Sequence, residues 1–336
     1  MKIAIHQSEG SFSDDWINCC KEKHIPYKIV NCYSTNIVKQ IKDCDALMWH
    51  FHHASSKDVL FAKQLLFAVQ ATGKKVFPDF NTAWHFDDKV GQKYLLEAIK
   101  GPLVPSYAFC TKGEAIRWAK STVFPKVFKL RRGAGSANVR LVKTRKQAIK
   151  LINKSFGKGF RLYNPWEGLK ERRRKYKMGE TTFVDILQGI VRLLIRTNFE
   201  RTVGKEKGYV YFQDFVAGCS CDYRVKVING KCWAFKRLVR ENDFRASGSG
   251  NLVFSECEIP LKIIEIAFEI SERLKLQCIA FDFLIDKEET PFITEMSYGF
   301  GYSDGENYGY WTRDLLFHKG SFNPFCWMID SLINSR

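Results

Sequence analysis

The sequence has no internal repeat, no low-complexity segment and no apolar stretch long enough to cross a bilayer. A spanning helix needs about 20 mostly apolar residues in a row. The first ten residues, MKIAIHQSEG, contain only a brief apolar stretch, which is shorter than the apolar region of a signal peptide. We therefore expect a folded protein without a membrane span, located in the cytoplasm.

Cysteine patterns typical of disulfide frameworks and zinc sites are also missing. The chain has 11 Cys, an odd number, and no CxxC pair. The adjacent pair Cys19 and Cys20, and the pair Cys219 and Cys221, do not have the spacing of zinc ligands. Reduced, buried thiols are therefore expected rather than disulfides.

Acidic residues are few relative to basic ones, with 36 Asp and Glu against 53 Lys and Arg and a net charge of +17. This balance favours polyanions as partners: nucleotide phosphates, nucleic acid, acidic glycans or an anionic membrane face. The excess is concentrated between Lys143 and Lys207, where residues 170–177 read KERRRKYK. Such a run is most often a solvated helix face. Because no RNP, zinc-finger or helix-turn-helix motif is present, nucleic-acid binding is the least favoured interpretation.

The first 85 residues or so alternate between short apolar runs and helical patterns. This alternation predicts a parallel, helix-covered sheet. The predicted strands are residues 2–6, 27–30, 46–49 and 75–77, and the predicted helices are residues 14–23 and 57–72.

A helix pattern at residues 87–99, followed by Pro102 and Pro105, predicts a domain boundary near residue 100. From residue 208 the pattern changes to closely spaced strands. The chain is therefore predicted to combine α/β and α+β architecture in three parts: residues 1–100, residues 101–207 with a basic helical insertion, and residues 208–336.

A strand ending in Lys129 is followed by a glycine-bearing loop that begins at Gly133. Glycines allow backbone N–H groups to close around phosphate oxygens, and the lysine adds a positive charge. Further along, Gln213 lies in an alternating strand whose polar face could reach an adenine edge. Taken singly, each motif is more often an ordinary hairpin or strand.

Two further motifs supply charge. Arg224, Arg237 and Arg240 lie on successive predicted strands, and Arg245 lies in the segment DFRASGSG. Guanidinium groups bind phosphate and carboxylate oxygens in pairs, although a surface salt-bridge network is an equal alternative. Asp282 and Glu295 lie amid apolar residues on two strands of a predicted hairpin. Buried carboxylates are costly unless they meet cations, which could be Mg²⁺ or a buried arginine.

In this order and spacing, the motifs resemble the ATP-grasp superfamily, near its glutathione-synthetase and ribosomal-protein glutamate-ligase branch. The resemblance spans roughly residues 86–300, and it implies an N-terminal parallel α/β domain followed by a two-lobed ATP-grasp fold. It further implies ATP contacts at a set of residues that starts with the lysine of an Asp-Lys pair, namely Lys89, Lys129, Gly133, Ala134, Gly135, Ser136, Gln213, Asp214, Phe215 and Val216. It places Arg224, Arg237 and Arg245 near the substrate, and Mg²⁺ at Asp282, Glu295 and Ser297.

Two features depart from the resemblance. The family's last metal motif is usually Glu-x-Asn, whereas this chain has Ser297 at the third position, so binding of a second Mg²⁺ is open. Asp214 stands where a Glu is more usual. The aromatic-rich segment 298–310 is predicted to shape the pocket of the acceptor substrate.

The resemblance implies a ligase that uses ATP and one or two Mg²⁺ to activate a carboxylate as an acyl phosphate and join it to an amine. Small-molecule substrates are expected, and the basic charge favours an acidic one, such as a sugar acid in surface-polysaccharide precursor modification. The alternatives are a phosphotransferase on the same fold and a basic nucleic-acid-binding protein. The histidines His50, His52 and His53 follow a predicted strand, where substrate contact or helix capping is favoured over a metal site.

Overall fold

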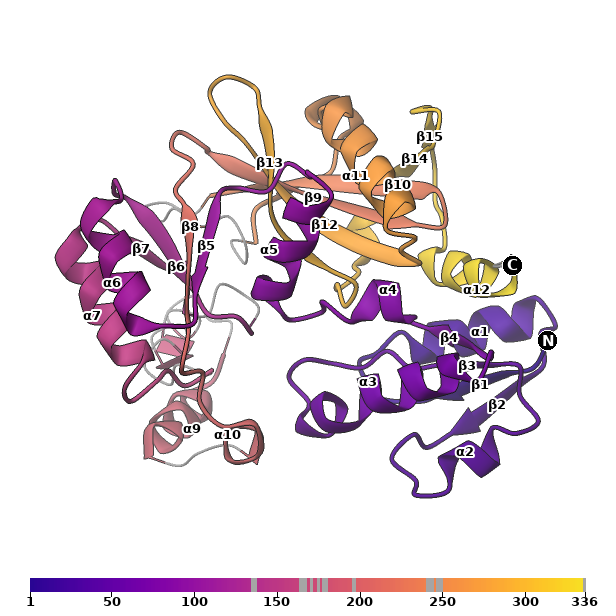
Figure 1. The fold of residues 1–336 in the computed structure, drawn as a ribbon. Helices are drawn as coiled ribbons and strands as arrows, with labels where there is room; N and C mark the ends of the chain where they lie inside the picture. The colour runs from indigo at the N-terminus through magenta and orange to yellow at the C-terminus, as the bar shows by residue number, and fades with distance from the viewer. Residues whose placement is uncertain are drawn as a thin grey trace. The chain divides into compact units, whose positions relative to one another are not determined.

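The computed structural model describes residues 1–133, 138–162, 168–169, 172–173, 176, 181–194, 198–239, 245 and 250–334, with the side chains of 192–194, 198 and 304 excepted. The chain forms two compact units (Figure 1). The first contains Met1–Phe86, Leu96–Pro102 and Ala217–Arg336, and the second contains Asp87–Leu95 and Leu103–Val216. The three-part division at residues 100 and 207 stays a prediction.

The N-terminal part of the first unit is a parallel sheet, as the sequence predicts, and its strand order is β2-β1-β3-β4. Its central strands are short and wholly buried, which is typical of parallel sheets covered by helices. The strands are β1 (Ile3–His6), β2 (Tyr27–Val30), β3 (Ala46–Met48) and β4 (Lys75–Phe77), and the helices are α1 (Ser13–Glu22), α2 (Ile37–Gln40), α3 (Ser56–Ala71) and α4 (Phe80–Ala83).

The rest of the first unit is a seven-stranded sheet of order β13-β12-β9-β10-β14-β15, in which β11 pairs with β10. Its paired strands run antiparallel. The strands are β9 (Cys221–Ile228), β10 (Lys231–Leu238), β11 (Leu252–Val253), β12 (Cys278–Ile285), β13 (Pro291–Ser297), β14 (Gly309–Thr312) and β15 (Phe317–Lys319), with helices α11 (Leu261–Arg273) and α12 (Pro324–Asn334) and 3₁₀ turns at Glu256–Glu258 and Asp304–Glu306.

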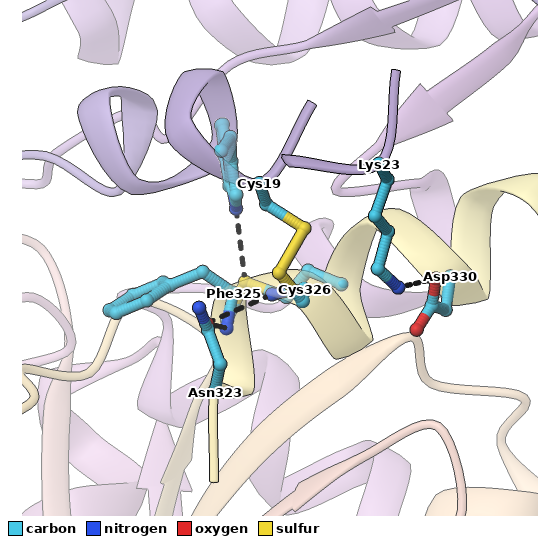
Figure 2. Close-up of a disulfide and its surroundings, with 8 residues drawn as sticks. Cys19, Lys23, Asn323, Phe325, Cys326 and Asp330 are labelled. Carbon is cyan, nitrogen blue, oxygen red and sulfur yellow. Dashed lines mark hydrogen bonds and ion pairs between the residues drawn. A yellow bond between two sulfur atoms is a disulfide. The ribbon is translucent and has the colours of Figure 1, made fainter. Parts of the chain in front are cut away.

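A disulfide between Cys19 and Cys326 joins α1 to α12 (Figure 2). The prediction that the thiols are all reduced is therefore wrong for this pair. The two cysteines are 307 residues apart, so no local spacing pattern could indicate the bond. Lys23, directly after α1, also pairs with Asp330 of α12 at 2.5 Å. Helix α12 is thus fixed to the N-terminal domain by a covalent bond and by charge.

The second unit is built on the antiparallel sheet β5-β8-β6-β7. Its core lies between this sheet and the helices α6 and α7, with Phe128 and Phe212 among the fully buried side chains. The elements are α5 (Lys89–Ala98), which ends in the first unit, β5 (Ser106–Phe109), α6 (Lys112–Ser121), β6 (Lys126–Lys129), β7 (Arg140–Val142), α7 (Arg145–Ser155), α9 (Phe183–Leu194), α10 (Asn198–Val203) and β8 (Val210–Asp214). Within the described part of the chain, no helix is long and apolar enough to span a bilayer.

Candidate functional site

Lys129 and Gln213 meet on one face of the sheet in the second unit. In the register of β6 and β8, Val127 lies opposite Gln213 and Lys129 opposite Tyr211. Side chains two residues apart share a face, so the lysine and the glutamine are diagonal neighbours. The Lys129 ammonium donates a hydrogen bond to Gln213 Oε1 at 2.7 Å. The structure therefore brings together two residues that the motifs predict in one nucleotide site.

The Gln213 side chain is buried and held from both ends. Its amide nitrogen donates to Ser106 Oγ at 3.1 Å, and Tyr211 donates to the same hydroxyl at 2.9 Å. The Gln213 amide thus has protein partners on both sides, and the adenine contact predicted for this strand stays a prediction. Phe215 and Val216 follow the end of β8 and are half-buried.

Asp214 points to the opposite face of β8. Its carboxylate pairs with Lys126 at 2.5 Å, and the Lys126 ammonium also lies 5.0 Å from the centre of the Tyr107 ring. The nucleotide role predicted for Asp214 stays a prediction. Its geometry shows a charge pair that ties β8 to β6.

The start of α5 anchors the base of the glycine loop. Asp87 accepts a hydrogen bond from the Gly133 N–H at 2.7 Å, and the buried Lys89 ammonium donates to Gly133 O at 2.9 Å. Asp88 accepts from the first N–H groups of α5, those of Val90 and Gly91, at 3.1 and 3.0 Å. Gly133 has a φ of 114°, a backbone conformation that favours glycine. Lys89 of the predicted Asp-Lys pair, together with Asp87, thus fixes Gly133 at the start of the loop.

The far end of the same loop is fixed by Asn138. Its side-chain amide donates to the carbonyl oxygens of Arg161 and Leu162 at 3.1 and 2.9 Å. The loop residues between the two anchors, Ala134, Gly135 and Ser136, lie outside the described residues. Their predicted contacts with phosphate stay predictions.

In the first unit, charged side chains form a row across three strands. Arg224 on β9 lies opposite Asp282 on β12 and binds both its carboxylate oxygens, at 2.8 and 2.9 Å. Arg237 on β10 lies opposite Asp222 on β9 and binds it at 2.5 and 2.8 Å. Arg237 also reaches Asp282 at 3.0 Å. The two predicted arginines therefore converge on the predicted metal ligand.

Burial and the neighbouring arginines shift the pKa of the aspartates in this row in opposite directions. Burial alone would raise the pKa of the Asp282 carboxyl, but Arg224 and Arg237 outweigh it and hold that pKa below its ordinary range. Burial raises the pKa of the Asp222 carboxyl to about 6, against the pull of Arg237. Asp282 is therefore ionised at neutral pH.

Glu295 and Ser297 complete the predicted metal set on β13. Glu295 lies directly opposite Asp282, and Ser297 lies opposite Ala280, so all three candidate ligands share one face. Among the described residues, Asp282 accepts three N–H groups, one at Oδ1 and two at Oδ2, whereas a carboxylate offers about four acceptor positions. Mg²⁺ needs only one or two protein carboxylates beside phosphate oxygens and water, so this donor set fits the ion.

The other predicted substrate residues are only partly described. Arg245 is half-buried, and Arg240 lies outside the described residues together with most of the segment DFRASGSG. Within the described ranges, no group of three or more His, Cys, Asp or Glu side chains could hold a metal ion. The magnesium site proposed for this row therefore rests on two carboxylates.

Lys226 continues the row of β9 and is fully buried. Its ammonium donates to Gly301 O at 2.6 Å and pairs with Glu306. Burial lowers the pKa of Lys226 to about 8, although Glu306 acts in the opposite direction. The ammonium lies among four aromatic rings, those of Trp233, Phe235, Phe300 and Tyr302. The lysine thus fixes the aromatic-rich segment after β13 against the sheet.

The histidines after β3 have separate roles. His50 is buried, stacks on Phe12 with ring centres 3.7 Å apart, and accepts the Phe12 N–H at its Nδ1. His52 accepts the Ala54 N–H at 3.2 Å, ahead of α3, whose N-cap is Ser55. Neither histidine caps the helix directly, so the capping interpretation is wrong for them, while substrate contact stays a prediction.

Asp222, Lys226 and Asp87 are the polar residues of these clusters to which the motifs assign no role. Asp222 and Lys226 flank Arg224 at intervals of two, so strand alternation could have placed all three on one face. No sequence pattern points to a role for Asp87. Its contact with the Gly133 N–H in the structure shows that role.

No family model and no curated protein matches the chain. Solved structures do match it along its length. A RimK-domain ATP-grasp protein of Sphaerobacter thermophilus is 12% identical with a TM-score of 0.57, over 99% of this chain and 100% of that one. D-cycloserine synthetase is 12% identical with a TM-score of 0.58, over 99% and 98% of the two chains.

A third similar structure is the D-alanine–D-alanine ligase of Bacillus anthracis complexed with ATP. It is 12% identical with a TM-score of 0.54, over 99% of this chain and 96% of that chain. These likenesses show that the chain has the ATP-grasp fold. The fold that the motifs predicted is therefore confirmed.

Proposed function

We propose that this protein is an ATP-dependent carboxylate–amine ligase that forms an amide through an acyl phosphate. The observation that carries the proposal is the arrangement of three side chains on neighbouring strands: Arg224 on β9, Asp282 on β12 and Glu295 on β13. It offers an ionised carboxylate, a second carboxylate directly opposite, and arginine charge beside them on an ATP-grasp fold. In the second unit, Lys129 and the backbone after β8 would contact the nucleotide.

In the proposed reaction, the substrate carboxylate attacks the γ-phosphate of ATP and releases ADP, and the amine then displaces phosphate from the acyl phosphate. Two anions must approach each other, so charge neutralisation is the main requirement. Lys129 and Lys89 would hold phosphate oxygens, and Arg224 and Arg237 would balance the substrate carboxylate. Asp282 and Glu295 would hold Mg²⁺, which supplies further positive charge at the phosphates, with Ser297 acting through water.

We also propose a class of substrate and a cellular location. The net charge of +17 favours an acidic carboxylate substrate, for which a sugar acid of a surface-polysaccharide precursor is our candidate. The segment fixed by Lys226 and Glu306 would border the acceptor amine. We propose a cytoplasmic location, where ATP is available. We also propose that one or two Mg²⁺ ions bind.

The test is a screen of amino acids and sugar acids for ADP release, with hydroxylamine added to trap an acyl phosphate as a hydroxamate. A ligase releases ADP only when a carboxylate is present and yields the hydroxamate. Lys129→Met should lower the rate by about 10²–10³, as for loss of one charge-stabilising donor. Lys120→Met, at an exposed position of α6, is the matched control and should leave the rate unchanged.

ADP release that requires only an alcohol would instead show the phosphotransferase, and no hydroxamate would form. Tight nucleic-acid binding that falls steeply with salt, without ADP release, would support the remaining alternative. Equal rates for the Lys129 and Lys120 variants would remove the lysine from the proposed mechanism.

A further inference from the structure

Helix α9 in the second unit carries a row of large apolar side chains that face solvent. Their exposed fractions run from 45 to 59%, and they follow the spacing i, i+1, i+4, i+7 and i+8 of a single helix face. They are Phe183, Val184, Leu187, Ile190 and Val191. Isolated exposed apolar residues are common, but a continuous face of five on a helix of 12 residues indicates a surface that binds something.

Two described residues of the segment before α9, Leu169 and Arg172, pack on the opposite side of this helix. Gly189 of α9 is buried, and a Cβ atom there would lie 2.9 Å from Leu169 Cδ1 and 3.1 Å from Arg172 Cδ. Arg172 also donates to Asp185 O at 2.9 Å. Leu169 and Arg172 thus cover the Gly189 side of α9, while the apolar face stays exposed. Tyr176 makes a ring contact with Phe183, the first residue of that face.

Most of the protein's net charge lies in the part of the sequence that contains this helix. Between Lys143 and Lys207 there are 18 Lys and Arg and 6 Asp and Glu, a difference of +12 out of the total of +17. Three of the acidic residues are described, and each contacts an arginine: Asp185 with Arg172, Glu200 with Arg161 and Glu206 with Arg132. The segment that contains α9 is therefore strongly positive.

We propose that α9 binds the surface of an anionic membrane through its exposed apolar face, and that the net positive charge of the segment 143–207 adds to the attraction. An amphipathic helix with Lys and Arg beside a Phe- and Leu-bearing face lies in the plane of the lipid headgroups, and a basic cluster adds attraction to anionic lipids. Nucleic acid would use the charge and leave the apolar face in water. A second copy of the chain would bring two positively charged segments together. An anionic lipid surface satisfies both features at once.

The test uses the full-length protein and sedimentation with vesicles of phosphatidylcholine alone or mixed with phosphatidylglycerol. The protein should sediment with the anionic vesicles and not with the neutral ones. Leu187→Gln combined with Val191→Gln should lower the partition coefficient by about tenfold or more, because two apolar side chains no longer leave water. Leu60→Gln combined with Phe61→Gln is the matched control, since both residues are exposed apolar positions of α3 and the net charge is again unchanged.

ADP release in solution should be the same in both double variants, which shows that each is folded. Equal partition of the two double variants on anionic vesicles would overturn the proposal, as would binding that ignores lipid charge. A change from oligomer to monomer in the Leu187 and Val191 variant, without vesicle binding by the parent protein, would show that the face binds a second copy and would also overturn it.

Discussion

The guanidinium of Arg224 binds both carboxylate oxygens of Asp282 across the β9–β12 pair, at 2.8 and 2.9 Å. The sequence left open whether a metal or an arginine balances this buried carboxylate. In the structure two arginines do so, because Arg237 reaches it as well. Glu295 lies directly opposite Asp282 on the neighbouring strand, so a second carboxylate is placed on the same face as the arginine pairs.

Asp282→Asn should lower the free energy of unfolding by about 3–5 kcal/mol, because removal of one partner of a buried ion pair leaves the other charge uncompensated. Urea denaturation measures the loss. Glu265→Gln is the control, since it breaks an exposed pair with Lys262 and should cost far less stability. An Asp282→Asn protein as stable as its parent would contradict a structural role for the arginine pairing.

Asp87 offers a second test, at the anchor of the glycine loop. It has a φ of 56°, which Asp and Asn tolerate better than Ala, and it accepts the Gly133 N–H. Asp87→Asn keeps an acceptor oxygen and the backbone preference, whereas Asp87→Ala removes both. We expect the alanine variant to raise the KM for ATP and to cost about 1–2 kcal/mol of stability, and the asparagine variant to do much less. Indistinguishable KM values for the two variants would remove Asp87 from loop positioning.

Local patterns predicted the elements of this protein well. Alternation of apolar and polar residues located β9, β10, β12 and β13, because a strand buries one face. The same period could not show that Arg224 meets Asp282, since their pairing depends on strand order between segments 58 residues apart. Strand β14 and helix α12 were not predicted, because the aromatic-rich end of the chain has no clear period of two or 3.6.

The Cys19–Cys326 bond should contribute to stability by restricting the unfolded chain. A disulfide closing a long loop is worth about 2–4 kcal/mol, and this one spans 307 residues. Cys19→Ser combined with Cys326→Ser should lower the unfolding midpoint of the oxidised protein by a matching amount. A thiol reductant should lower the midpoint of the parent protein and leave that of the double variant in place. The same response to reductant in both proteins would show that the bond does not form in solution.

The buried His50 should make the protein less stable in acid. Burial lowers the pKa of its imidazole to about 3, with His52 and His53 acting in the same direction, whereas an unfolded histidine has a pKa of 6.5. Between these two values the unfolded chain binds a proton that the folded chain does not. The free energy of unfolding therefore falls as pH drops from 6.5 towards 3, by about 1.4 kcal/mol per pH unit for this group.

His50→Asn tests this sign directly, because asparagine can still accept the Phe12 N–H but does not titrate. At pH 8 the variant should be less stable than the parent, because the stacking of the His50 ring on Phe12 is lost. As pH falls from 6.5 the parent loses stability faster, so the gap between the two proteins should shrink. Denaturation midpoints measured at several pH values check this, and the titrations common to both proteins cancel in the difference. A gap that stays constant from pH 7 to pH 4 would mean that His50 takes up its proton in the folded state.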